Sequence, residues 1–331
     1  MADVLIGLQR GDEGKGKITN YLSKTNDYDC FVRFNGGPNA GHTIYINNQK
    51  IVLHQVPCGI LQNKPCLISS HCVIDIVKLN KELEMLRKFE CDVDNNLFIA
   101  YNAHIITEES IKEDKQNNKI GTTGSGIGQT YSKKSLRTGY RMCDYSHMYK
   151  FSIVEPFGFL SKFKHILFEG AQGFDLDIDY GDYPYVTSSN CITGAIFLNG
   201  LSPKITPKVF GICKIYETYV GSKVFQPPQD TLLKHLQKIG EEYGATTGRM
   251  RQCNWLNLKQ LITSCFINHV DVLIINKCDI LEKLQTFKLY DENSRLMVFS
   301  NFNDMKDYIM TLFKRYYRKI EVIFSSNKDS L

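Results

Sequence analysis

The sequence predicts an α/β fold in which a central, mainly parallel β-sheet is flanked by helices. Short apolar runs that end at a glycine or a polar residue recur along the chain, as is typical of buried parallel strands. Helical stripes of apolar residues lie between some of these runs. Several runs lead directly into a glycine-rich loop. With 331 residues, 43% of them apolar, the chain can build a large core, and we expect a single domain over residues 1–331.

Six apolar runs are expected to be strands. In chain order they are Val4–Leu8, Cys30–Phe34, Ile166–Phe168, Val209–Ile215, Val270–Ile275 and Glu321–Phe324. Because ligands of such folds bind beyond the carboxyl ends of the strands, the loops that follow these runs are the places to look for function.

Two segments show helical periodicity, and both stripes are interpreted as faces that pack on the core. The first consists of Leu79, Leu83, Leu86 and Phe89, and the second of Met305, Tyr308, Ile309, Leu312, Phe313, Tyr316 and Tyr317. Two polar segments are expected to be an exposed turn, Lys112–Lys119, and a loop, Gln226–Asp230.

Composition restricts the kind of protein. The formal charge of +5 contains no long block of one sign, which favours small anionic ligands at least as much as nucleic acid. The eleven cysteines include no C-x-x-C pair, so reduced, mostly buried thiols are expected rather than a disulfide framework or a metal knuckle. No run is long enough for a signal peptide or a membrane span, and we expect a cytoplasmic protein that binds neither nucleic acid nor membrane.

The first glycine-rich loop, GDEGKGKI at residues 11–18, follows the first expected strand. It matches the G-x-x-x-x-G-K spine of a phosphate-binding loop, but Ile18 stands where that loop carries a magnesium-binding hydroxyl. Backbone N–H groups and the start of a helix can hold a phosphate there. The groups involved are Gly11, Gly14 and Gly16 with Lys15 and Lys17. A coincidental glycine turn is equally compatible with this loop alone, and whether Asp12 or Glu13 replaces the hydroxyl stays open.

Two further loops combine glycines with polar side chains. The second, NGGPNAGHT at residues 35–43, offers the Asn39 amide and the His42 imidazole for phosphate or base recognition. The third, GTTGSGIG at residues 121–128, adds two hydroxyls and is followed by Arg137, a combination suited to a monophosphate. A structural histidine and a turn without function are the alternatives.

Later loops carry groups that recognise bases and carboxylates. After Ile166–Phe168, Gln172 can read a base edge and Thr187 can contact a phosphate. The alternating acids there, Asp175, Asp177 and Asp179, lack the glycine and glutamate of an EF-hand, so calcium is discounted. GATTGRMR, residues 244–251, can clamp a carboxylate through its arginines. NKCD, residues 276–279, selects guanine through the Asp279 carboxylate, so GTP is expected rather than ATP.

Taken together, these motifs resemble the adenylosuccinate synthetase family from Leu5 to about Asp329. They occur in the family's order: GDEGKGKI, VRFNGGPNAGHT, LHQVPCGIL, GTTGSGIG, FEGAQG, YPYVTSSN, YVGS, GATTGR and NKCD. The resemblance implies a P-loop-like GTP-binding synthetase that converts inosine monophosphate (IMP), GTP and L-aspartate into adenylosuccinate, GDP and phosphate through a 6-phosphoryl intermediate. It also implies Mg²⁺ as cofactor.

The resemblance also implies roles for individual residues. Catalysis would use Asp12 as the base, with His42, Gln172 and Lys15. GTP would be bound by Gly11, Glu13, Gly14, Gly16, Lys17, Gly41, Thr43, Arg251, Asn276, Lys277, Asp279, Ser325, Ser326 and Asn327. IMP would be bound by Asn39, Ala40, Thr122, Thr123, Arg137, Gln172, Thr187 and Arg249. Aspartate would be bound by Ala245, Thr246, Thr247, Arg249 and Arg251. Magnesium would be held by Asp12, which replaces the missing hydroxyl, and by the Gly41 carbonyl.

The family resemblance further implies a homodimer in which Arg137 reaches across the interface. The chain departs from the family pattern without losing a reacting group: Arg10 replaces tryptophan, Pro38 histidine, Ser125 arginine and Gln129 proline, and SSNKD replaces STGPD. The chain is also compact, like archaeal and some viral forms. Two alternatives therefore stay open: a viral-type 2-amino-adenylosuccinate synthetase acting on deoxyguanylate (dGMP), against which Asp12 argues, and a GTP-binding regulatory module.

Overall fold

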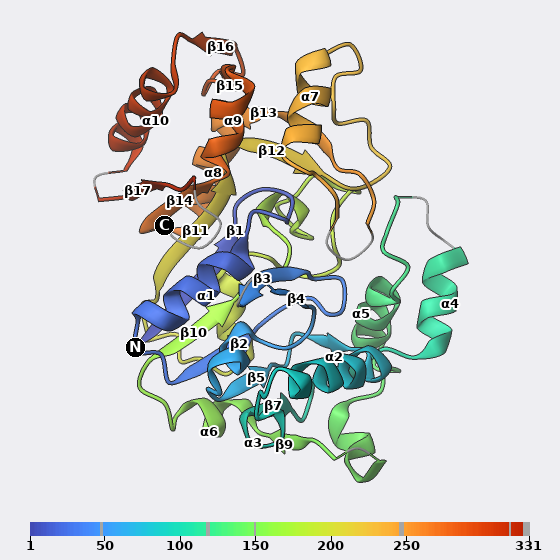
Figure 1. The fold of residues 1–331 in the computed structure, drawn as a ribbon. Coiled ribbons are helices and arrows are strands. Elements are labelled where there is room, and N and C mark those ends of the chain that lie inside the picture. Colours follow the sequence, from blue (N-terminus) through green and yellow to red (C-terminus); the bar gives the residue numbers. More distant parts are fainter. Residues whose placement is uncertain (47–48, 117–119, 149, 245–247, 318, 327–331) are drawn as a thin grey trace.

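A nine-stranded parallel sheet forms the centre of the molecule in the computed structural model, which describes residues 1–46, 49–116, 120–148, 150–244, 248–317 and 319–326. The strand order is β17-β14-β11-β1-β10-β2-β5-β7-β9, and every neighbouring pair in it is parallel. Figure 1 shows this sheet with helices packed around it. The predicted α/β fold with a mainly parallel central sheet is confirmed.

The elements have the following bounds. The large sheet contains β1 (Ala2–Gly7), β2 (Cys30–Arg33), β5 (Cys66–Ile68), β7 (Leu97–Ala100), β9 (Ser152–Val154), β10 (Ile166–Glu169), β11 (Lys208–Lys214), β14 (Val272–Asn276) and β17 (Glu321–Phe324). The α-helices are α1 (Lys15–Thr25), α2 (Ile76–Lys88), α3 (Val93–Asn96), α4 (Glu108–Gln116), α5 (Ile127–Leu136), α6 (Pro156–Leu160), α7 (Thr231–Ile239), α8 (Leu258–Asn268), α9 (Cys278–Leu284) and α10 (Phe302–Tyr316). Short 3₁₀ helices are η1 (Cys58–Gln62), η2 (Met142–Met148), η3 (Phe174–Leu176) and η4 (Thr193–Asn199).

The six strands predicted from the sequence are confirmed with small shifts in their ends, and they occupy consecutive places in the sheet, from β17 to β2. The three strands of this sheet that sequence reasoning missed, β5, β7 and β9, form the opposite edge. They have only three or four residues each, and none of them leads directly into a glycine-rich loop, as β2 and β10 do.

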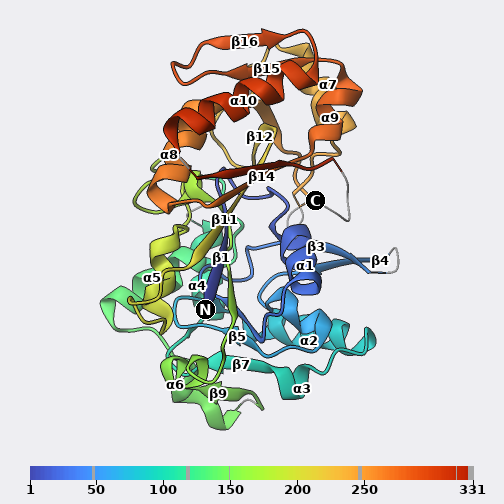
Figure 2. The same ribbon diagram turned by 90° about the vertical axis from the view of Figure 1, so that its left-hand side faces the viewer.

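A second, four-stranded sheet lies at one end of the molecule, in the order β12 (Tyr216–Tyr219), β13 (Gln252–Asn257), β15 (Phe287–Tyr290) and β16 (Leu296–Phe299). Figures 1 and 2 both place it at the top, beside α7 and α10, with α3, α6 and β9 at the bottom. Two small pairs complete the strands: β3 (His42–Ile46) with β4 (Gln49–Leu53), and β6 (Val73–Ile74) with β8 (His104–Ile105).

Both predicted helical stripes pack on the core. In α2, Leu79, Leu83 and Leu86 are buried. In α10 the buried residues of the predicted stripe are Met305, Ile309, Leu312 and Phe313, whereas Tyr316 is 50% exposed. The expected core role of Tyr316 is therefore wrong, because Tyr316 is the last residue of α10 and half of its surface stays exposed.

The segment expected to be an exposed turn, Lys112–Lys119, is mainly helical. Its first five residues belong to α4, and residues 117–119 lie outside the described part of the chain. The polar composition of this segment wrongly predicted an exposed turn, because Asp114 is buried. It accepts hydrogen bonds from Thr122 Oγ1 (2.9 Å) and the Gly126 N–H (2.8 Å). These contacts tie the helix to the third glycine loop. The predicted loop at Gln226–Asp230 is confirmed.

The cysteines agree with the expectation of reduced, mostly buried thiols. All eleven are free, and Cys143 alone among them is not buried. Burial raises the pKa of thiols such as Cys66 and Cys265. None of the helices in the described residues is long and apolar enough to cross a membrane.

Candidate active site

A cavity of about 380 Å³ opens beside the carboxyl ends of the central strands. The parallel pairing of β1 with β10 and β11 brings the loops that follow these strands to one edge of the sheet. Twelve of the residues predicted to act in catalysis or binding line this cavity: Gly11, Asp12, Lys15, Asn39, Ala40, Gly41, His42, Thr122, Thr123, Gln172, Thr187 and Arg249. The predicted IMP-binding and catalytic residues are thus brought together, with the exception of Arg137.

The first glycine loop turns directly from β1 into α1. Gly14 caps the helix with a φ of 91°, a left-handed conformation in which glycine is not strained. Glu13 is buried and accepts hydrogen bonds from the Gly11 N–H at 2.8 Å and from Lys15 Nζ at 2.6 Å. Its carboxylate therefore shapes the loop and does not point into the cavity as a ligand.

Asp12 differs from Glu13, because its carboxylate faces the cavity and pairs with a distant arginine. Asp12 Oδ2 lies 2.8 Å from Nε of Arg251, which is far away in the sequence. The Arg251 NH1 group in turn contacts the carboxylate of buried Glu242 at 2.5 Å. Burial disfavours the charged guanidinium, but Asp12 and Glu242 outweigh this effect and raise the pKa of Arg251.

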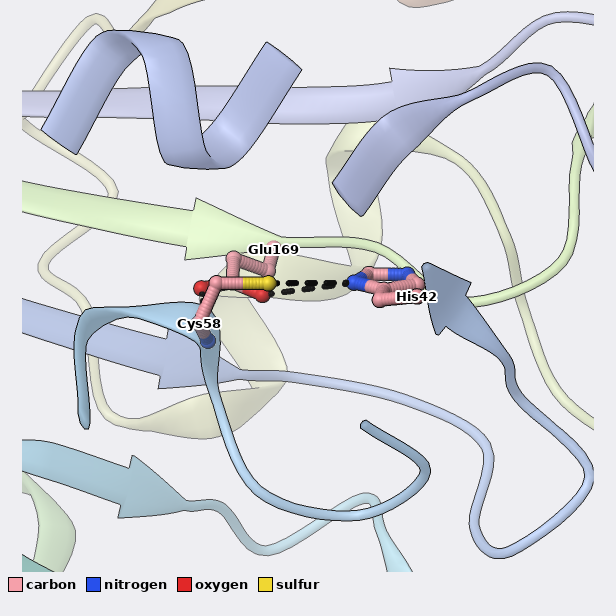
Figure 3. Close-up of side chains that lie close together, drawn as sticks. All are labelled: His42, Cys58 and Glu169. Carbon is pink, nitrogen blue, oxygen red and sulfur yellow. Dashed lines mark hydrogen bonds and ion pairs between the residues drawn. The ribbon is translucent and has the colours of Figure 1, made fainter. Parts of the chain in front are cut away.

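His42 begins β3 and is buried among three other polar side chains. Figure 3 shows its imidazole facing Cys58 and Glu169, whose Sγ and Oε2 atoms are each 3.5 Å from Nδ1. Arg33 lies 3.0 Å from Nε2 and 3.2 Å from Nδ1. Although nitrogen, sulfur and oxygen donors meet here, the guanidinium already supplies the positive charge beside them. We interpret the group as one that orients the imidazole.

The same surroundings determine the charge of His42. Burial, together with the positive charges of Arg33 and Lys15, lowers its pKa well below the ordinary histidine value. Glu169 has the opposite shift: burial raises its pKa, and Arg33 opposes the rise. At neutral pH the imidazole is therefore uncharged and can act as a hydrogen-bonding group beside an anion.

Gln172 is the clearest candidate for direct contact with a ligand. Both polar atoms of its side-chain amide are buried, yet neither has a hydrogen-bond partner within the described residues, and the residue lines the cavity. Leaving such a group unsatisfied costs about 1–3 kcal/mol. A ligand that occupies the cavity and hydrogen-bonds the amide recovers this energy.

The third glycine loop meets the arginine loop across the cavity. Both terminal nitrogens of Arg249 donate to the Gly121 carbonyl, at 3.1 and 3.2 Å. Asp114, which sequence reasoning missed as a site residue, lines the cavity and accepts a hydrogen bond from the Gly126 N–H of the third glycine loop. Nothing in the local sequence marks Asp114, because its role depends on contacts with residues that follow α4.

The residues predicted to bind guanine lie next to the phosphate loop, outside the lining of the cavity. Lys17 Nζ donates to Ser325 Oγ at 2.6 Å and to Asn276 Oδ1 at 3.3 Å. The Asn276 amide donates to the Glu13 carbonyl at 2.8 Å. Asp279 is partly exposed and pairs with Lys283 at 2.8 Å. The two ends of the predicted GTP site are therefore adjacent.

Other predicted residues have different positions. Gly16, Thr43, Lys277 and Ser326 do not line the cavity, and Ser326 is exposed. Arg137 ends α5 in an exposed position away from the cavity. Ala245, Thr246, Thr247 and Asn327 lie outside the described residues, so their predicted roles stay predictions.

Arg10, one of the departures from the family pattern, is held by a buried acidic pair. Its NH1 group lies 2.7 Å from Glu217 and 3.1 Å from Asp175, and the guanidinium carbon lies 4.6 Å from the centre of the Phe225 ring. Burial raises the pKa of both carboxyl groups, and Arg10 limits the rise. Asp175 therefore serves to hold Arg10.

Comparisons with known proteins agree with the motifs. The family model for adenylosuccinate synthetase matches residues 4–154 and 158–301. The adenylosuccinate synthetase of Thermodesulfovibrio yellowstonii is 38% identical over 338 residues, which cover 86% of this chain and 79% of that protein. The enzyme of Chlorobium limicola is 38% identical over 345 residues, with 87% and 79% covered.

Two solved structures share the fold. The fully ligated adenylosuccinate synthetase of Plasmodium falciparum superposes with a TM-score of 0.85 and 28% identity, covering 98% of this chain and 97% of the other. The succinoaminodeoxyadenylate synthetase of cyanophage S-2L, bound to dGMP and to dATP as an energy donor, superposes with a TM-score of 0.80. Its identity is 19%, with 99% and 93% covered, so this likeness concerns the fold alone.

Proposed function

The chain belongs to the adenylosuccinate synthetase family, a family of GTP-dependent ligases, and we propose that it joins L-aspartate to IMP at the expense of GTP. The products are adenylosuccinate, GDP and phosphate. The observation that carries this proposal is the meeting of Asp12, His42 and Gln172 in one cavity, with the Gln172 amide buried and unpartnered among the described residues.

The first step transfers the γ-phosphoryl group of GTP to O6 of the purine. Asp12 takes the proton from N1, so that O6 gains the electron density to attack phosphorus while GDP leaves. Gln172 holds the purine through its amide. His42 and the ammonium group of Lys15, which both line the cavity, are assigned to stabilising the charge of the transferred group.

The second step replaces the phosphoryl oxygen with nitrogen. The amine of aspartate attacks C6, the C6–O6 bond breaks, and inorganic phosphate leaves with its oxygen. Arg249 and Arg251 bind the carboxylates of aspartate, because guanidinium groups pair with planar oxyanions through two N–H donors. Thr246 and Thr247 are proposed to complete this pocket.

GTP is proposed to bind across the phosphate loop and the NKCD turn. Lys17 already contacts both Asn276 and Ser325, which supports one continuous nucleotide site. Asp279 accepts hydrogen bonds from N1–H and the 2-amino group of guanine, a pair of donors that adenine lacks. Asn39, Thr122, Thr123 and Thr187 are proposed to hold the phosphate and ribose of IMP.

Magnesium fits the donors present at the phosphate loop. The Asp12 carboxylate and Gly41 both line the cavity, and Mg²⁺ prefers a few hard oxygen ligands together with phosphate oxygens. Asp12 and the Gly41 carbonyl would hold the ion. When bound, it neutralises charge on the phosphates of GTP.

We also propose a cytoplasmic homodimer with composite sites. Arg137 is exposed and away from the cavity of its own chain, as required of a residue that serves the site of a second copy. The buried, free thiols suit a reducing compartment.

The reaction is tested by supplying GTP, Mg²⁺ and L-aspartate with either IMP or dGMP, and identifying the products by mass. Adenylosuccinate from IMP is the expected result. Product from dGMP alone would mean that Asp12 does not determine the choice of purine, and would direct attention to Arg10 and Pro38. GTP turnover that is indifferent to both IMP and aspartate would favour a GTP-binding regulatory module.

A further inference from the structure

Glu242 is a buried carboxylate with no assigned role, two residues after Gly240, the C-cap of α7. Its side chain has no exposed surface. Lys214 Nζ lies 3.0 Å from one carboxylate oxygen and 2.9 Å from the other, while the Tyr216 hydroxyl donates to the first. The second oxygen also accepts from NH1 of Arg251 at 2.5 Å. Four hydrogen bonds from three side chains therefore converge on Glu242.

These groups extend into the candidate active site as a chain of alternating charges. Lys214, Glu242, Arg251 and Asp12 follow one another at contact distance, so the two cations and two anions balance. Burial alone would raise the pKa of Glu242, but Lys214 and Arg251 outweigh it and lower the pKa to about 2. The carboxylate is therefore ionised throughout the working pH range.

The geometry divides the Arg251 guanidinium between two partners. NH1 is directed at Glu242, and Nε is directed at Asp12. The backbone agrees with this arrangement, since the Arg251 N–H donates to the Glu242 carbonyl at 2.9 Å. Glu242 thus determines where the guanidinium lies, whereas Asp12 is the partner on the cavity side.

We propose that Glu242 is the positioning residue of the aspartate pocket: it orients Arg251 so that an incoming carboxylate replaces Asp12 as the partner on the cavity side. This inference rests on the proposed function. When the substrate carboxylate arrives, the charge balance of Arg251 is preserved and Asp12 is released toward the purine. Without Glu242, the guanidinium loses its fixed orientation, and binding of aspartate weakens.

A competing role for the same segment is support of the guanine site. Lys277 Nζ donates to the carbonyl of Gly240 at 3.2 Å, two residues before Glu242. If this contact were the important one, a change at Glu242 would act on GTP rather than on aspartate. The Michaelis constants of the three substrates therefore distinguish the two roles.

The test compares the full-length wild-type enzyme with Glu242→Gln, which removes the charge but keeps the volume. We expect the KM for aspartate to rise at least about 10-fold, with the KM values for GTP and IMP within about 2-fold of wild type and kcat less affected. Glu241→Gln is the matched control, because Glu241 is adjacent and exposed; its kinetics should equal those of wild type. An unchanged KM for aspartate, or a larger change for GTP, overturns the inference.

A double-mutant cycle tests whether Glu242 acts through Arg251. In an Arg251→Leu background, adding Glu242→Gln should change the KM for aspartate less than about 2-fold, because the guanidinium is already absent. Multiplication of the two single effects overturns the proposal. Wild-type enzyme that forms no adenylosuccinate would instead refute the proposed function itself.

Loss of folding in the Glu242→Gln variant would not end the test. Glu242→Asp keeps the charge that Lys214 requires, but it is one methylene shorter and cannot reach both Lys214 and Arg251 at their present distances. It should fold and show the same selective rise in the KM for aspartate. A folded Glu242→Asp enzyme with wild-type KM for aspartate overturns the inference.

Discussion

Asp12 and Gln172, the two residues proposed to act on the purine, share an unusual backbone conformation. Their φ angles are 60° and 55°, in the left-handed region that residues other than glycine seldom adopt. Such strain persists where the surrounding contacts enforce it, and it is concentrated at functional sites. Because the two residues follow neighbouring strands, β1 and β10, these turns direct a carboxylate and an amide into the same cavity.

The first prediction concerns Asp12 as the base. Asp12→Asn keeps the size of the side chain but cannot accept the N1 proton, so kcat should fall by about 10²- to 10⁴-fold. The fold should be retained, because the side chain is partly exposed and packs little. Circular dichroism tests whether the fold is retained, and steady-state kinetics measure kcat. Asp27→Asn, at an exposed position, is the control, and retention of more than about a tenth of wild-type activity in Asp12→Asn would reject the assignment.

The second prediction concerns the pH dependence of stability. The pKa of His42 is lowered in the folded state, so below the ordinary value of about 6.5 the unfolded chain binds a proton that the folded chain does not. Stability is therefore complete above that pH and falls as the pH decreases, by at most about 1.4 kcal/mol per pH unit for this group.

Melting temperatures measured between pH 5 and 7.5 test this effect. His42→Asn should show a shallower loss of stability at low pH than wild type. The raised pKa of Glu169 acts with the opposite sign, but it is present in both proteins and does not account for their difference. Equal slopes for the two proteins would show that His42 accepts a proton in the folded state.

At the scale of elements, the order of strands joins the two ends of the chain into one nucleotide site. The phosphate loop follows β1, NKCD begins at the last residue of β14, and Ser325 follows β17. Only β11 separates β1 from β14, and β17 pairs directly with β14. Lys17 can therefore contact Asn276 and Ser325 at once.

The third prediction tests guanine recognition by the helix that follows β14. Asp279→Asn replaces an acceptor of two N–H groups by an amide, so the KM for GTP should rise about 10- to 100-fold. Xanthosine triphosphate, which carries a carbonyl in place of the 2-amino group, should become the better substrate. Glu282→Gln, exposed on the same helix, should leave both nucleotides unaffected. An unaltered preference for GTP in Asp279→Asn would place the base elsewhere.

At the scale of the whole molecule, Arg137 is the predicted IMP-binding residue that one chain does not bring to its own cavity. The fourth prediction follows from a composite site: Arg137→Leu and His42→Asn should each be nearly inactive, yet mixing them should restore activity. With random exchange, half of the dimers are mixed and each mixed dimer has one intact site, so recovery approaches about a quarter of wild type. Absence of recovery after confirmed subunit exchange would contradict the shared site.

Much of the fold could be predicted because six strands are apolar runs, several of which lead directly into a motif-rich loop. They are six consecutive strands of the nine-stranded sheet, from β17 to β2. The other strands of this sheet, β5, β7 and β9, do not lead into such loops. They could not be predicted, because their pairing depends on neighbours that are distant in the sequence. Asp114 shows the same limit for the site: it lies in a polar segment, and only its contacts with Thr122 and Gly126 reveal its role.

The sequence by itself determined the fold class, the family and the chemical groups of the candidate site. Glycine turns, a guanine-selecting carboxylate and paired arginines each lie within a few consecutive residues, so they can be recognised without the structure, and their order along the chain identifies the family. The tertiary structure alone decided what each carboxylate does. The Glu13 carboxylate accepts hydrogen bonds within its own loop, whereas the Asp12 carboxylate pairs with Arg251 and Asp12 lines the cavity. Glu242 faces two cations that only folding brings together, because the interactions of a buried charge depend on neighbours in space rather than in sequence.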